Sequence, residues 1–212
     1  MMTEAARAPA TQARGRLRRE ALLASARELL GQQDSSQITL AEIAAHAAVP
    51  KSSAYHFSTD ALGLYVELVA ILDGELQQLM RQPLPRVESW EAAMGVIIDR
   101  AATFFEDNPA AQQLMLSSQT PPLIKRYSRR ADMETSRLIE ELIAAQFVLP
   151  DIPERGRIFF HAIEAADLMF GLSLFESGAL LRAMVDEAKR MSCAYLALYL
   201  PRYLPRRSEA LG

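Results

Sequence analysis

The chain has 212 residues, of which 50% are hydrophobic and 23% charged, so it can bury a sizeable core and is not disordered by composition. The single cysteine, Cys193, excludes a disulfide framework and a zinc site built from cysteines. The net charge of −3 argues against nucleic acid, but residues 1–60 carry seven basic and six acidic side chains against sixteen and twenty in the rest. The average charge therefore conceals a mildly basic N-terminal segment followed by an acidic remainder of the chain.

The distribution of apolar residues predicts an all-α protein. Ala, Leu, Glu, Arg and Gln are abundant, whereas runs of Val, Ile and Thr with period-two alternation are missing. The first 13 residues show no periodicity and are expected to form a disordered tail, and the last few residues after Leu200 are expected to fray. Apolar residues at helical spacing predict helices over residues 15–30, 40–49, 51–57, 60–80, 88–105, 109–116, 122–147, 155–176 and 180–200.

No apolar stretch approaches the roughly 20 residues that span a bilayer, and the N-terminus has no apolar secretory region. We therefore expect a cytoplasmic protein without a membrane partner.

The most informative segment runs from residue 39 to residue 57. Thr39 precedes an apolar run and Glu42 follows three residues later, which is the pattern of a capping box. Pro50 ends this short helix, and a second helix begins at Lys51. Two short helices joined by a tight turn have the form of a helix-turn-helix unit. The residues expected in its core are Leu40, Ile43, Ala44, Val49 and Tyr55.

The sequence ITLAEIAAHAAVPKSSAYHF, residues 38–57, resembles the DNA-binding region of the TetR family of transcriptional regulators. The resemblance extends over residues 15–80. It implies a helix-turn-helix DNA-binding domain over residues 14–60 and a larger helical domain over residues 61–205 for effector binding and dimerisation. It further implies a ligand-responsive regulator, by default a repressor, that binds a near-palindromic operator in double-stranded DNA as a homodimer.

The second helix of the pair is expected to present donors to phosphates and base edges, and the arginines before it are expected to follow the DNA backbone or minor groove. The expected DNA-binding residues are Arg16, Thr39, Lys51, Ser52, Ser53, Tyr55 and His56. Each also has a plainer interpretation: Thr39 caps a helix in any case, Tyr55 could be a core aromatic, and the charged side chains could simply be solvated.

Two positions depart from the family pattern. The turn usually carries Gly where this chain has Ala48, and a left-handed Ala costs about 1–2 kcal/mol unless the turn winds differently. The family commonly continues Tyr-x-x-Phe-Pro-x-Lys, whereas here Tyr55 is followed by HFSTDA. The phosphate contact usually given by that lysine is therefore expected to be absent.

Three polar residues, His161, Glu164 and Asp167, interrupt the most apolar predicted helix at i, i+3 spacing. They could form a buried polar cluster, hydrogen-bond across a dimer interface, or orient a ligand in an apolar cavity. Few charges converge among these helices, so the effector is expected to be a small, mostly apolar molecule. The expected lining residues are Met94, Ile98, Met115, Tyr127, His161, Glu164 and Leu168.

The last two predicted helices carry more large apolar residues than a monomer exposes, which predicts a dimer interface. The expected interface residues are Leu172, Phe175, Met184, Met191, Tyr195 and Leu198. A helical enzyme is the competing interpretation, but the sequence has no nucleophile–base pair, metal-ligand spacing or phosphate loop, so we expect no catalysis, no cofactor and no metal. A third interpretation is a relative with impaired DNA binding that acts as a small-molecule or protein-binding module.

Overall fold

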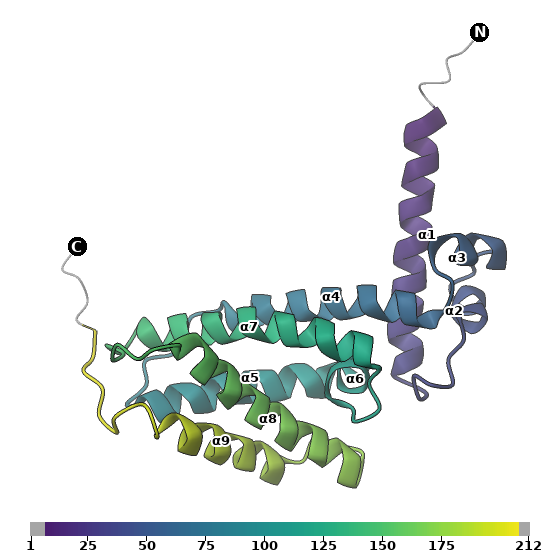
Figure 1. Cartoon of the computed structure of the whole chain (residues 1–212). Helices are drawn as coiled ribbons and strands as arrows, with labels where there is room; N and C mark the ends of the chain where they lie inside the picture. The colour runs from purple at the N-terminus through teal and green to yellow at the C-terminus, as the bar shows by residue number, and fades with distance from the viewer. Residues whose placement is uncertain (1–6, 208–212) are drawn as a thin grey trace. The chain divides into compact units, whose positions relative to one another are not determined.

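The computed structural model describes residues 7–207, with side chains from residue 12 onward, and every regular element in this range is a helix (Figure 1). The all-α prediction is confirmed. The chain divides into two compact units, residues 1–70 and 71–212. The helices are α1 (Arg7–Leu30), α2 (Leu40–His46), α3 (Lys51–Phe57), α4 (Ala61–Met80), α5 (Trp90–Asp107), α6 (Pro109–Ala111), a π-helical turn (Gln112–Leu116), α7 (Pro122–Ala144), α8 (Arg155–Ser177) and α9 (Arg182–Leu196).

Helix α1 begins at Arg7, well before the expected start near residue 15. Residues 7–13 of the predicted tail therefore belong to a helix, and residues 1–6 lie outside the described part. The extension is consistent with the helix propensity of Ala, Arg and Gln, and Pro9 stands in the first turn, where proline is tolerated. Further along, Leu22, Ala26 and Leu30 of α1 are completely buried in the first unit.

Helix α2 begins with the predicted capping box. The Glu42 backbone N–H donates to Thr39 Oγ1 at 3.2 Å, and the Thr39 backbone N–H donates to Glu42 Oε2 at 2.8 Å. Both hydrogen bonds satisfy N–H groups that have no partner within the helix. The side chain of His46 at the other end of α2 accepts or donates a hydrogen bond at 2.5 Å between Nδ1 and Ser25 Oγ, which links α2 to α1.

The turn between α2 and α3 is a Schellman motif with Ala48 in the left-handed region, at φ 52°. The Val49 N–H donates to the Ala44 carbonyl at 2.9 Å and the Ala48 N–H donates to the Ala45 carbonyl at 3.1 Å. Val49 is 8% exposed and Ala44 is 1% exposed, as their predicted core positions require. The turn therefore keeps the usual geometry of glycine-containing turns despite the alanine.

The predicted domain boundary between residues 60 and 61 lies at the start of α4, whereas the division between the two units falls inside this helix. The first turns of α4 belong to the first unit because Leu64, Tyr65 and Leu68 are buried there. The Tyr65 hydroxyl donates to the Ser35 carbonyl at 3.2 Å, and Arg19 forms an ion pair with Glu67 at 2.8 Å.

In the second unit α8 packs against both α9 and α7, and α5 packs against α9 (Figure 1). Trp90, Phe159 and Phe170 are among the largest fully buried side chains. The π-helical turn at residues 112–116 packs on α8 so closely that a Cβ on Gly171 would lie 2.9 Å from the Leu116 carbonyl oxygen. These contacts place the π-helical turn beside the cavities described below.

Residues 201 and 206 make specific contacts within the second unit, which corrects the expectation that this segment frays, and residues 208–212 lie outside the described part. The Trp90 indole N–H donates to the Pro201 carbonyl at 3.0 Å, and Phe147 and Arg206 form an isolated antiparallel bridge. The Arg206 guanidinium also lies over the Phe147 ring. Polar contacts that hydrophobic periodicity cannot reveal thus fix this segment.

Helix α8 is the one described helix that is long and apolar enough to cross a membrane by length and composition alone. The sequence expectation of no such stretch was wrong, because three isolated polar residues do not offset the many apolar residues around them. The same composition suits a core helix, and Phe159, Ala162 and Phe170 of α8 are buried within the second unit.

Candidate functional site

In the first unit α1 and α3 together form a polar, positively charged surface. A groove of about 540 Å³ is lined by Arg14, Gly15, Arg18, Ser52, Ser53, His56 and Phe57. The Arg18 Nη1 donates to Ser53 Oγ at 3.3 Å, which connects the basic segment of α1 directly to the second helix of the helix-turn-helix. Arg14 and Arg18 share one face of α1 because they are four residues apart.

The exposed face of α3 also carries Lys51 and Tyr55. The Lys51 ammonium lies 5.8 Å from the centre of the Tyr55 ring, a cation–π distance. Tyr55 is 48% exposed, so its assignment to the core was wrong. In a helix of seven residues, Ala54 is the one buried member, which leaves the side chains around it free to meet a partner.

Two of the expected DNA-binding residues, Arg16 and Thr39, make contacts within the protein. Arg16 is not in the lining of the α1–α3 groove and forms an exposed ion pair with Glu20 at 3.6 Å. Thr39 Oγ1 donates to Glu42 Oε2 at 2.7 Å in addition to accepting the cap hydrogen bond. The arginine cluster is visible in the sequence. Which of its arginines face α3 is not, because that depends on the helical phase of α1 relative to α3.

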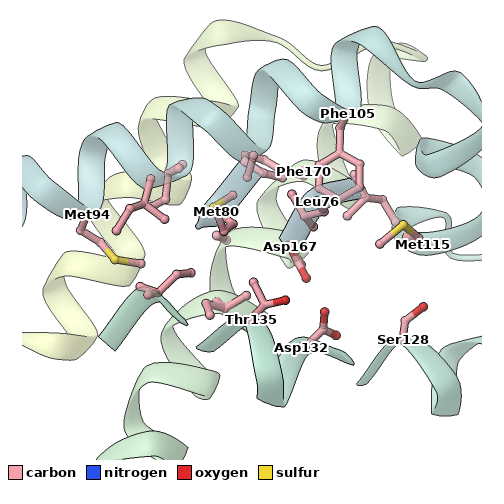
Figure 2. Close-up of a pocket in the computed structure, with 17 residues that line it drawn as sticks. Leu76, Met80, Met94, Phe105, Met115, Ser128, Asp132, Thr135, Asp167 and Phe170 are labelled. Atoms are coloured by element: carbon pink, nitrogen blue, oxygen red, sulfur yellow. The ribbon is translucent and has the colours of Figure 1, made fainter. Parts of the chain in front are cut away.

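The second unit contains two cavities that share a boundary. An inner cavity of about 50 Å³ lies among α4, α5, α7 and α8, and its walls are mostly apolar (Figure 2). An outer cavity of about 570 Å³ lies among the π-helical turn, α7 and α8. Both cavities are lined by Met115, Leu116, Ser128, Asp132 and Asp167.

Acidic side chains converge at this boundary, and the sequence analysis had singled out Glu164 and Asp167 among them but not Asp132. Figure 2 shows the carboxyl groups of Asp132 from α7 and Asp167 from α8 pointing toward each other across the cavity. Asp73 of α4 is nearby and 6% exposed. Glu164 lies at the outer cavity, where it forms an ion pair with Arg129 at 2.6 Å.

The environment of these acids favours their neutral forms. Burial raises the pKa of Asp73 to about 7. Burial also raises the pKa of Asp132, with further increases from the negative charges of Asp167, Asp73 and Glu164 and an opposing effect from Arg129. The pKa of Asp167 rises mainly through burial, then through Glu164. Removing carboxylates from water and placing them together both penalise the charged state.

The expected ligand-binding residues separate into four groups. Met94 and Ile98 line the inner cavity, Glu164 and Leu168 line the outer one, and Met115 lines both. Tyr127 and His161 are in the lining of neither of these cavities. His161 is exposed, and its Nδ1 lies 3.0 Å from the Tyr195 hydroxyl of α9. His161 thus contacts α9, whereas Glu164, one turn later on α8, contacts α7.

The expected interface residues lie on or just after the last two helices, with unequal exposure. Phe175 and Leu198 are each 75% exposed, and Met191 is 39% exposed. Met184 and Tyr195 are half-buried, and Leu172 is half-buried beside the outer cavity. Leu168, Leu181 and Tyr199 are further exposed apolar residues in this region that sequence reasoning did not assign to an interface.

Comparisons with known proteins agree with this architecture. Residues 88–200, more than half of the chain, match the family described as "Tetracyclin repressor-like, C-terminal domain". No curated protein matches significantly.

Two solved structures share the fold. A TetR-family transcriptional regulator from Streptomyces coelicolor has a TM-score of 0.68 at 17% identity, and the match covers 86% of this chain and 99% of that one. A TetR transcriptional regulator from Rhodococcus sp. RHA1 has a TM-score of 0.62 at 15% identity, with coverage of 85% and 96%. Together with the family match, the helix-turn-helix of α2 and α3 and the cavity-bearing helical unit lead to one conclusion: the chain belongs to the TetR family of transcriptional regulators.

Proposed function

We propose that the protein is a homodimeric, ligand-responsive repressor that binds a near-palindromic DNA operator through α1 and α3. The observation that carries the DNA-binding part is the α1–α3 groove, in which Arg18 contacts Ser53 and Arg14 lies on the same side. Guanidinium groups beside exposed hydroxyl and imidazole donors are suited to a phosphate backbone flanking readable base edges.

The side chains proposed to contact DNA are Arg14, Arg18, Lys51, Ser52, Ser53, Tyr55 and His56. Arg14 and Arg18 take the place of Arg16, whose guanidinium pairs with Glu20. Thr39 contributes by fixing the start of α2, because its hydroxyl hydrogen is already donated to Glu42. The Lys51–Tyr55 stack presents the lysine ammonium as a phosphate contact on a partly immobilised side chain.

The proposed dimer forms through the exposed apolar residues of α8 and the chain around α9. Phe175 and Leu198 would each leave a large apolar surface in water in a monomer. Two protomers paired in this way would place two α3 helices on successive major grooves, as the half-site spacing of dimeric helix-turn-helix proteins requires.

A mobility-shift and anisotropy titration on the DNA upstream of the protein's own gene tests DNA binding. Lys51→Ala and Arg18→Ala should each weaken binding and lower the slope of log affinity against log salt by about one. Arg137→Ala is the matched control, because Arg137 is an exposed arginine of α7 in the second unit. Equal affinity of all four proteins would contradict the assignment of the α1–α3 surface.

Loss of binding by every protein, including the wild type, would favour the alternative, a module with impaired DNA binding. That alternative is supported by one local feature, the absence of a lysine at the start of α4, where Asp60 instead accepts a hydrogen bond from the Gly63 N–H at 3.0 Å.

A further inference from the structure

The boundary between the two cavities carries more negative than positive groups. Asp132 and Asp167 line both cavities, and neither makes a hydrogen bond or ion pair with another described residue. The basic residues of the outer cavity are otherwise engaged. Arg129 pairs with Glu164 at 2.6 Å, and the exposed Lys125 donates to the Ser118 carbonyl at 3.3 Å.

A second, independent feature points into the same space. Ser128 is 7% exposed, and its hydroxyl has no hydrogen-bond partner among the described residues. Ser128 lines both cavities on the same face of α7 as Asp132, and Figure 2 shows its hydroxyl pointing toward the Met115 side of this space. A buried hydroxyl without a partner has a free energy cost that a bound polar group would remove.

Beyond these polar groups the walls are apolar. The inner cavity is lined by apolar side chains that include Met80, Met94, Ile98, Phe105 and Phe170. A ligand that fits must therefore combine hydrogen-bond donors and positive charge at one point with an apolar body. A bare metal ion would leave these walls unused, and a carboxylate would meet Asp132 and Asp167 at close range.

We propose that the effector is a small organic cation, an alkyl- or arylammonium whose N–H groups bind Asp132, Asp167 and the Ser128 hydroxyl while its apolar body occupies the inner and outer cavities. This identity of the effector rests on the proposed ligand-responsive function. It replaces the sequence-based expectation of a mostly apolar effector. That expectation missed the convergence of the acids because they come from different helices and meet only in the folded unit.

Three probes of equal chain length separate charge from hydrophobicity: n-octylammonium, 1-octanol and octanoate. Isothermal titration calorimetry and thermal shift on the full-length protein measure binding without DNA. At pH 8 we expect octylammonium to bind about ten-fold or more tightly than octanol, and octanoate to bind weakest. Asp132→Asn with Asp167→Asn should reduce octylammonium affinity to that of octanol, and Ser128→Ala should reduce it less.

The matched control is Glu141→Gln, which removes an exposed carboxylate from the same helix, α7, and should leave the affinity unchanged. Octanol and octylammonium binding equally, octanoate binding best, or the asparagine variants keeping full affinity would each overturn the cation site. Binding by none of the three probes would overturn it as well.

The pH dependence gives a further readout. The titratable and charged groups that face the site are Asp73 of α4, Lys125, Arg129 and Asp132 of α7, and Glu164 and Asp167 of α8. Octylammonium stays cationic throughout, so its affinity should rise between pH 6 and pH 9, as Asp167 loses its proton first and Asp132, whose pKa is raised further, follows. Octanol affinity should stay level, and a parallel rise for both probes would contradict carboxylate recognition.

Release of fluorescent operator DNA is followed separately. Octylammonium binding without DNA binding would contradict the proposed regulator and leave the cation site supported. DNA binding without any binding of octylammonium would support the DNA-binding regulator and contradict the cation site. Release of DNA by octylammonium from the wild type, and not from the double asparagine variant, supports both.

Discussion

Gly171 of α8 lies against the backbone of Leu116 in the π-helical turn, where a Cβ would come within 2.9 Å of the Leu116 carbonyl oxygen. Both residues line the outer cavity. Because the obstructing atom belongs to the backbone, it cannot move aside by a simple rotation of a side chain. The contact therefore fixes the distance between α8 and the π-helical turn, and π-helical turns are frequent at functional sites.

Gly171→Ala should lower the free energy of unfolding by about 1–3 kcal/mol, which is the usual range for overpacking. This corresponds to a decrease of roughly 2–4 °C in melting temperature per kcal/mol for a chain of this size. Gly95→Ala is the control, since a Cβ on this helical glycine of α5 meets nothing within 4 Å. It should raise stability by about 0.4–1 kcal/mol. Equal melting temperatures for the two variants would refute the close contact.

Ala48→Gly should stabilise the helix-turn-helix. The alanine holds φ at 52°, a conformation that costs an L-residue about 1–2 kcal/mol and costs glycine little. Glycine also loses more conformational entropy on folding than alanine does, which offsets part of this gain. The expected net increase in the free energy of unfolding is about 0.5–1 kcal/mol. Urea denaturation measures it. Ala45→Gly, in the last turn of α2, should instead lose up to about 1 kcal/mol, and a loss in both variants would contradict the strain at residue 48.

Leu198→Glu should disrupt the proposed homodimer. Its side chain is 75% exposed next to α9, so a charge there costs the folded protomer little and would be buried without a partner in an apolar interface. Sedimentation should show a dimer for the wild type at micromolar concentration and a monomer or aggregate for the variant, with operator binding lost. Leu123→Glu, on an exposed leucine of α7, should remain dimeric. A monomeric wild type would rule out the interface.

Asp167→Asn should raise stability in a way that depends on pH. Burial keeps the pKa of Asp167 in the folded protein above the ordinary value of 3.8, so the folded state binds more protons than the unfolded state above that value. The free energy of unfolding therefore falls as pH rises from about 4, until the raised pKa is passed. The asparagine side chain does not titrate. The free energy of unfolding of the variant should therefore exceed that of the wild type by about 1–3 kcal/mol at pH 8 and hardly at all at pH 4.

Denaturant melts of the wild type and Asp167→Asn at the two pH values provide the measurement. Glu141→Gln serves as the reference because its carboxylate is exposed. A gain at pH 4 as large as that at pH 8 would show that Asp167 is not held in its neutral form by the fold.

Much of the architecture follows from local sequence. The capping box at Thr39 and Glu42 depends on two residues three positions apart, and the sequence therefore predicted the start of α2. Proline and glycine mark the ends of several helices for the same local reason. The helix-turn-helix could also be predicted from the sequence. The small residue Ala44 and the apolar residue Val49, which its close-packed turn requires, lie only five positions apart and are joined by a backbone hydrogen bond.

Relations between separate helices were decided by the tertiary structure. The phase of α1 brings Arg18 to Ser53 while Arg16 pairs with Glu20, although both arginines belong to one basic run. Likewise, Glu164 pairs with Arg129 and Asp167 faces Asp132, whereas His161 meets Tyr195. Periodicity assigns a residue to a face of its own helix, but it contains no information on which helix covers that face. Asp132 of α7 and Asp167 of α8 line both cavities, Asp73 of α4 lies close by, and only the packing of these three helices brings the aspartates together.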